Sequence, residues 1–245
     1  MEIGIFTIVY NGYGKYIQKW CESIADSTAL PTMATVALFG KEHGLSDKMA
    51  NKCKNILPCL NIVHCGDNIN IGSNRNRAVE NTNTEWLMLL SVDDILLPEA
   101  LDEITKRDSP DVEVIAVAYI EERVNLTKRY WPVPRTFEEG AMLNWRNYWL
   151  SPYSPFRRSF WKEHPYENCE YPNYLQVFAF ARTGARFATV NKPCVKYIRR
   201  ELSHAYRRTT NEHEALVKML DENAKTNEGA AVKYRLKRLK KAIGR

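Results

Sequence analysis

The chain has 245 residues, of which 44% are hydrophobic and 26% charged, and these ordinary globular proportions argue against disorder and collagen-like repetition. No apolar run is long enough to cross a bilayer, and we expect no signal peptide, because Met1 leads at once into a strand-like run. The six cysteines never form a C-x-x-C pair, so we expect reduced thiols and a cytoplasmic location.

The first hundred residues alternate between strand and helix patterns. Strands are expected at residues 3–10, 34–39, 59–65 and 85–90, and helices at 16–24, 49–57 and 73–80, with another helix opened by Pro98. This alternation predicts an α/β fold with a mostly parallel sheet, whose ligand binds outside the carboxyl ends of the strands. The turn at residues 11–14, the loop before Gly72 and the pair Asp93-Asp94 all fall at such ends.

The pattern changes after Tyr119. Residues 121–161 are rich in Arg, Pro and aromatic side chains, and they include Trp131, Trp145, Trp149 and Trp161. These rings could stack on sugars or nucleobases of an acceptor while the arginines hold phosphate. Alternatively, the tryptophans pack the interior of a second lobe. A helix at residues 174–182 and an extended segment at 187–197 are expected to follow.

The net charge of +6 is concentrated at the C-terminus. Seven cations and no acid follow Glu228: Lys233, Arg235, Lys237, Arg238, Lys240, Lys241 and Arg245. Residues 211–243 read as helical, with Val232, Leu236, Leu239 and Ile243 at helical intervals between these cations. Such a basic amphipathic helix suits an anionic membrane surface, a nucleic acid or an acidic partner. The alternative is a solvated helix packed on the body by its apolar stripe.

Three segments, in this order, resemble family-two glycosyltransferases of the GT-A fold: Thr7-Ile-Val-Tyr-Asn11, Gly72-Ser-Asn-Arg-Asn76 and the run from Glu85 to Pro98. A weaker similarity continues from Phe156 to Ser203. The resemblance implies a Rossmann-like, mostly parallel sheet flanked by helices, with a small acceptor lobe. It further implies a glycosyltransferase domain over residues 1–208 (nucleotide-sugar half 1–119, acceptor half 120–208) and a C-terminal helical basic extension over 209–245.

The resemblance also implies a donor site for a nucleotide sugar, expected to be a UDP-sugar. The residues implied to contact this donor are Thr7, Tyr10, Asn11, Gly72, Arg75, Asn76, Ser91 and Arg200. A sugar nucleotide leaves as a diphosphate, which Mn²⁺ or Mg²⁺ held by carboxylates would neutralise. Asp93 and Asp94, expected to be exposed past a strand end, would supply the carboxylates. The alternative is that this pair caps the helix that begins near Pro98.

The chain departs from the family pattern at two places on the donor side. The family usually has an Asp where Ser91 stands, and a hydroxyl supplies no charge to a metal. The family's acidic motif after the second strand is replaced by Phe39-Gly-Lys-Glu42, so the recognition of the nucleobase can differ.

The family's catalytic Asp falls on Asn173, whose amide accepts no proton at neutral pH. Glu170 is the substitute base that we favour, with Glu167 and His164 as the other candidates. An enzyme that retains the anomeric configuration would need no such base, although inversion is favoured. The resulting hypothesis is a hexosyltransferase acting on an anionic acceptor, foremost DNA with hydroxymethylated pyrimidines. The alternatives are a transferase that builds a surface or lipid-linked glycan and an inactive relative that binds sugar or nucleic acid.

Overall fold

The computed structural model describes residues 1–67, 70–123, 127–133, 151–166 and 185–199. The strands are β1 (Ile3–Val9), β2 (Met33–Leu38), β3 (Leu60–His64), β4 (Trp86–Leu89), β5 (Ile95–Leu96), β6 (Val114–Glu122), β7 (Lys128–Trp131), β8 (Phe156–Arg157) and β9 (Phe187–Ile198). The helices are the 3₁₀ helix η1 (Tyr13–Tyr16) and the α-helices α1 (Ile17–Ala25), α2 (Asp47–Ile56), α3 (Ile71–Glu80), α4 (Ala100–Thr105) and α6 (Arg158–Glu163).

These strands form one sheet in the order β3-β2-β1-β4-β8-β6-β9-β5, with β7 paired to β6. The first four strands are parallel to one another, and they make the parallel half of the sheet. In the mixed half, β8 is antiparallel to both β4 and β6, whereas β6 and β9 run parallel. The mostly parallel α/β sheet that the sequence predicts is therefore confirmed for β1 to β4.

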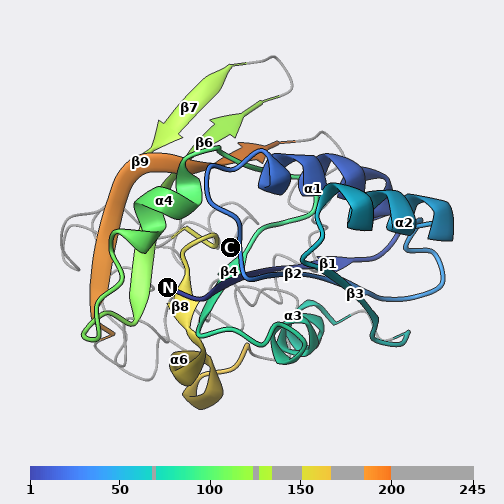
Figure 1. Ribbon diagram of the computed structural model, residues 1–245, viewed down its shortest axis with the longest axis horizontal. Coiled ribbons are helices and arrows are strands. Elements are labelled where there is room, and N and C mark those ends of the chain that lie inside the picture. Colours follow the sequence, from blue (N-terminus) through green and yellow to red (C-terminus); the bar gives the residue numbers. More distant parts are fainter. Residues whose placement is uncertain (68–69, 124–126, 134–150, 167–184, 200–245) are drawn as a thin grey trace, which may run out of the picture.

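Helices cover both faces of the parallel half. In Figure 1, α1 and α2 lie on one side of β1, β2 and β3, and α3 lies on the other side. Successive residues of β1 accordingly enter different cores: Ile5 packs with Trp20 of α1, and Phe6 packs with Val79 of α3. A strand buried on both faces needs apolar residues at nearly every position, which explains the continuous apolar run that begins at Ile3.

The expected boundaries agree closely with the observed ones. All four predicted strands of the parallel half and helices α1 to α3 begin and end within two residues of the expected positions. The extended segment predicted at 187–197 is confirmed as β9. The helices predicted at 174–182 and 211–243 lie outside the described residues.

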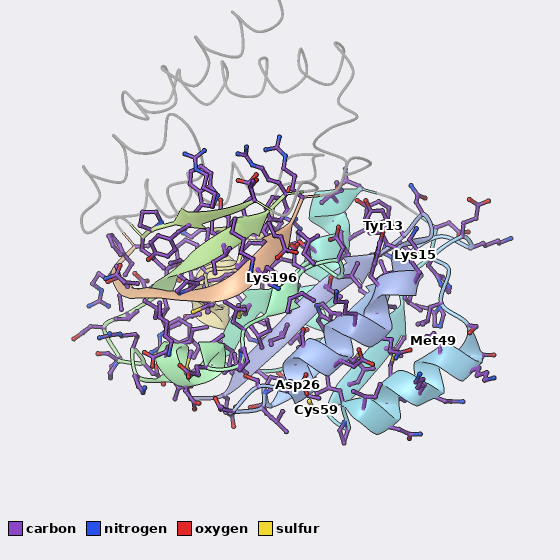
Figure 2. All side chains as sticks on the ribbon, turned by 90° about the horizontal axis from the view of Figure 1, so that it is seen from above. Tyr13, Lys15, Asp26, Met49, Cys59 and Lys196 are labelled. Atoms are coloured by element: carbon purple, nitrogen blue, oxygen red, sulfur yellow. The ribbon has the colours of Figure 1, made fainter. Side chains whose placement is uncertain are left out.

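The strand order marks one edge of the sheet as the expected ligand site. The chain runs from β1 outward through β2 and β3, and β4 then returns to the opposite side of β1. The order therefore reverses between β1 and β4, and ligands of open α/β sheets bind at the carboxyl ends beside such a reversal. Figure 2 shows this edge on the side of Tyr13 and Lys15, while Asp26 and Cys59 lie at the opposite edge.

The described residues bear on two expectations from the sequence, reduced cysteines and the absence of a membrane-spanning segment. Each of the five cysteines among them is a free thiol. No helix in the same residues has both the length and the apolar character that crossing a membrane requires.

Candidate functional site

The turn after β1 is joined to the loop after β2. Asn11 and Gly12 adopt left-handed backbone conformations, with φ of 46° and 76°. This turn lets the Gly12 N–H donate to the Glu42 carbonyl at 2.6 Å, and the Gly14 N–H donate to the His43 carbonyl at 2.7 Å. The two loops thus form one backbone-bonded rim beside the crevice.

Gly14 is fixed by steric contact in this rim. A Cβ atom at Gly14 would lie 2.5 Å from the carbonyl carbon of Gly44 and 2.5 Å from the backbone N of Leu45. These neighbours are backbone atoms, so neither can rotate away. Only glycine allows the two loops to approach this closely.

Aromatic rings stand along the same rim. The Tyr10 and Tyr13 rings are stacked with centroids 5.8 Å apart, and Tyr16 packs edge-on against Tyr13. Tyr10 is half-buried and Asn11 is exposed. Thr7 differs from the prediction, because its side chain is buried in β1 and only 1% exposed. Its hydroxyl therefore lies inside the protein and not at the rim.

The first turns of α3 bring Gly72 and Arg75 to the carboxyl edge. Asn70 caps this helix, because its side-chain oxygen accepts the Ser73 N–H at 3.0 Å. Gly72 and Arg75 are both buried, and the Arg75 guanidinium lies 5.4 Å from the centroid of the Tyr166 ring. Arg75 is the fifth residue of α3, one turn after the helix N-terminus at which Gly72 lies and where backbone N–H groups favour anions.

Asn76 has a different role from the predicted donor contact. Its Oδ1 accepts the Trp161 Nε1–H and the Tyr166 N–H, both at 2.9 Å, and its Nδ2 donates to the Tyr166 carbonyl at 2.7 Å. The carboxamide thereby attaches α3 to α6 and to the segment that follows it. Trp161 accordingly fits the packing interpretation of the tryptophans.

Asp93 and Asp94 follow β4 in a tight turn, in which the Asp94 N–H donates to the Ser91 carbonyl at 3.0 Å. The expectation that both carboxylates are exposed is wrong, since Asp94 is 1% exposed while Asp93 is half-buried. The Asp94 Oδ2 accepts the Tyr153 O–H at 2.7 Å, and its Oδ1 accepts the Ile198 N–H at 2.9 Å. The Ser91 side chain is also hydrogen-bonded to Asp94.

These contacts assign the two carboxylates to different tasks. Burial, and then the neighbouring Asp93 carboxylate, raise the pKa of Asp94 well above its usual range, against the opposing effect of its hydrogen bonds. Asp94 fixes the turn to β9, whereas the Asp93 side chain is half-buried beside it. The capping alternative is wrong, because α4 begins at Ala100 after Glu99 and the Asp94 oxygens bond elsewhere.

A cluster of charged and aromatic side chains adjoins this turn on the mixed half. Glu121 is buried, and its carboxylate accepts from Arg123 Nε at 3.2 Å, Arg199 Nη1 at 3.0 Å and Trp131 Nε1 at 3.0 Å. Burial raises the pKa of Glu121, but the bonds from Arg199 and Trp131 outweigh it and leave the pKa below its ordinary value. Burial, followed by the charge of Asp94, raises the pKa of Tyr197 to about 12.

The sequence analysis missed Tyr153, Tyr197 and the Glu121 carboxylate. Their partners lie far away along the chain, 59 residues for Tyr153 and Asp94, so no local motif marks them. The one available signal was the mixture of arginine and aromatic residues between 121 and 161.

Of the two other candidates for the catalytic base, His164 packs on Phe160 with ring centroids 4.7 Å apart, and Glu167 is outside the described residues. Glu170, Asn173 and Arg200, together with Trp145 and Trp149, are also outside them.

Comparisons with known proteins agree with this geometry. The family model described as glycosyl transferase family 2 matches residues 5–173. An uncharacterized glycosyltransferase of Methanocaldococcus jannaschii is 23% identical over 141 residues, which are 56% of this chain and 49% of that protein. The chain therefore spans about half the length of this curated relative.

Two solved structures share the fold. Residues 1–349 of Staphylococcus aureus TarS in complex with UDP-GlcNAc superpose with a TM-score of 0.63 at 17% identity, covering 91% of this chain and 66% of that one. The mannosyltransferase PcManGT from Pyrobaculum calidifontis, in complex with GDP-Man and Mn²⁺, gives a TM-score of 0.64 at 12% identity, covering 99% and 69%.

Proposed function

Because the chain belongs to glycosyl transferase family 2, we propose that it transfers a hexose from a nucleoside diphosphate sugar, a UDP-hexose, to an acceptor hydroxyl. The observation that carries this proposal is the meeting of the Asp93 turn, the β1–β2 rim and the start of α3 at one sheet edge. The solved relatives with bound UDP-GlcNAc or GDP-Man support a donor of this class.

Asp93 is the residue that we propose to hold Mn²⁺ or Mg²⁺. A hard cation of this kind takes one or two carboxylates together with phosphate oxygens and water, so a single presented carboxylate suits it. Within the described ranges, no group of three or more His, Cys, Asp or Glu side chains gathers as a metal site. The phosphates of the donor would be further ligands of the cation. The cation would stabilise the charge of the departing diphosphate.

The protein's own residues position the donor and accept the proton. The stacked rings of Tyr10 and Tyr13 offer a flat surface for the nucleobase. Arg75 supplies a fixed positive charge for the diphosphate, and we propose Arg200 as a second phosphate contact. We propose that Glu170 takes the proton from the acceptor hydroxyl as the sugar is displaced with inversion, in place of the amide Asn173. Glu170→Gln should lower the rate far more than Glu167→Gln, and equal mild effects would place the base elsewhere.

The acceptor that we propose is DNA with hydroxymethylated pyrimidines, whose free hydroxymethyl groups would receive the sugar. We propose that the reaction takes place in the cytoplasm. The seven cations after Glu228 favour a polyanion, and so do the exposed cations of β7. A base modified within a duplex must be reached in the groove or swung out, and aromatic platforms assist this step. A lipid-linked or surface glycan is the competing acceptor.

The test measures nucleoside diphosphate release from a panel of sugar nucleotides, with and without Mn²⁺, Mg²⁺ or EDTA. Acceptors are duplex DNA with and without hydroxymethylated pyrimidines, and lipid-linked sugars, each offered to the full chain and to a chain ending at Gly229. Release that depends on a UDP-sugar and on modified DNA supports the proposal. Sugar transferred only to lipid or glycan would reject the DNA acceptor, and no release with any donor would reject the activity.

A further inference from the structure

A set of side chains on β6, β7 and β9 has the features of an anion-binding site that the donor site does not use. We call it the hairpin cluster, and it comprises Glu121, Arg123, Arg129, Trp131 and Arg199. Glu121 is its centre, with a side chain only 6% exposed, and it receives bonds from Arg123, Arg199 and Trp131. Arg129 lies over the Trp131 ring with its guanidinium 3.9 Å from the ring centroid.

The central carboxylate orients Arg123 and Arg199, which bond it through Nε and Nη1. The bond to Arg123 uses one of the five N–H donors that a guanidinium carries. The bond from Trp131 to Glu121 likewise fixes the indole on which Arg129 stacks. Three planar cations are thus held in place around one carboxylate, an arrangement that suits the paired oxygens of phosphate.

Charge and exposure both favour an anionic partner at this surface. The charged residues on β6, β7, β9 and the residues that immediately follow β6 and β9 are six cations and two carboxylates: Arg123, Lys128, Arg129, Lys192, Lys196 and Arg199 with Glu121 and Glu122. The Arg123 side chain is 42% exposed, and Arg129 is exposed as well. Cations interleaved with rings are the pattern that binds single-stranded nucleic acid, by phosphate contact and base stacking.

Ring contacts connect the hairpin cluster to the Asp93 turn. Tyr119 stacks on Trp131 with centroids 6.0 Å apart, and it packs edge-on against Tyr153 at 5.8 Å. Tyr153 in turn donates its hydroxyl to Asp94. An acceptor lying on the cluster would therefore lie next to the turn that presents Asp93.

We propose that the hairpin cluster binds the phosphodiester backbone of a nucleic-acid acceptor. Arg123 and Arg129 contact phosphates, and the stacked Arg129–Trp131 pair offers a flat surface to a base. This inference rests on the proposed function, since it names the surface that holds the acceptor strand beside the donor site. A phospholipid surface would offer the same phosphate chemistry without bases to stack, and the experiment separates the two.

The experiment measures binding of fluorescein-labelled single-stranded and duplex oligonucleotides to the full chain by anisotropy, without donor, over a series of salt concentrations. We expect Arg123→Gln and Arg129→Gln each to weaken binding about fivefold to tenfold. Each loss of a phosphate contact should also reduce the slope of log affinity against log salt by about 0.7 to 0.9. Lys54→Gln, which removes an exposed cation from α2, is the matched control and should leave both values unchanged.

Vesicles containing phosphatidylglycerol and calorimetric titration with UDP complete the design. If Arg123→Gln and Arg129→Gln bind oligonucleotides as tightly as the unmodified chain, or if they lose only vesicle binding, the inference is overturned. Binding of UDP by the unmodified chain keeps the proposed function standing in either case. Conversely, loss of oligonucleotide affinity in the variants supports the cluster even if no sugar nucleotide releases its diphosphate.

Discussion

The two halves of the sheet are held together by different kinds of interaction. In the parallel half, side chains such as Ile5 are wholly buried, and polar groups bond mainly to the main chain, as Trp20 Nε1–H does to the Leu90 carbonyl. In the mixed half, two buried carboxylates, Asp94 and Glu121, accept bonds from side chains far away in the sequence. The geometry of the first half thus depends on backbone and apolar pattern, and that of the second on individual polar pairs.

The largest expected effect tests whether the two halves meet at a working site. Asp93→Asn removes the half-buried carboxylate that we propose to hold the metal ion, so we expect sugar transfer to fall about 10³-fold. Because Asp93 is not in the core, the melting temperature should change little. Nucleoside diphosphate release and thermal unfolding measure the two quantities. Asp111→Asn, which alters an exposed acid paired with Arg186, is the control that should keep full activity.

The parallel half should be most sensitive where two backbones touch. Gly14→Ala places a Cβ atom 2.5 Å from backbone atoms of the β2 loop, and we expect a loss of about 3 kcal/mol in the free energy of unfolding. Gly12→Ala meets no atom within 4 Å and suffers only from its φ of 76°, so it should cost about 1 kcal/mol. Urea denaturation of both variants compares them. Equal losses of unfolding free energy in the two variants would mean that the close contact between the loops does not contribute to stability.

The mixed half should be sensitive to the loss of one hydroxyl. Tyr153→Phe keeps the buried ring but leaves the Asp94 Oδ2 without its donor at 2.7 Å, which should cost about 2 kcal/mol of unfolding free energy. Thr82→Val removes a hydroxyl bonded to the Ala78 carbonyl in the parallel half, and about 1 kcal/mol is expected there. If Thr82→Val costs more than Tyr153→Phe, the contrast between the halves is wrong.

The smallest expected effect is a change in the free energy of unfolding at low pH. The pKa of Glu121 lies below its ordinary value of 4.5, since the bonds from Arg199 and Trp131 outweigh burial. A carboxyl with a lowered pKa adds stability above its unfolded pKa, and this stability disappears as pH falls through the folded pKa. The difference in unfolding free energy between the unmodified chain and Glu121→Gln should therefore be constant from pH 7 to about 5 and shrink below 4.5. A constant difference down to pH 3 would contradict the assignment.

The same contrast explains which features the sequence could predict. Patterns within about ten residues predict the strands of the parallel half and the place of Arg75 in the first half of α3. The fates of Asp93 and Asp94 could not be predicted, because adjacent side chains after a strand point in different directions. Which of them is buried depends on Tyr153 and Ile198, respectively 59 and 104 residues away. The Arg199 contact to Glu121 likewise spans 78 residues.

Strand β7 also bears on the behaviour of many copies of the chain at high concentration. Among the described strands it pairs with β6 alone, so no described strand covers its outer edge. Edges of this kind nucleate intermolecular sheets unless charge opposes the approach of a second edge. Exposed Lys128 and Arg129 place like charges on that edge in every molecule. The cations that we assign to acceptor binding would therefore also protect the protein from aggregating along β7.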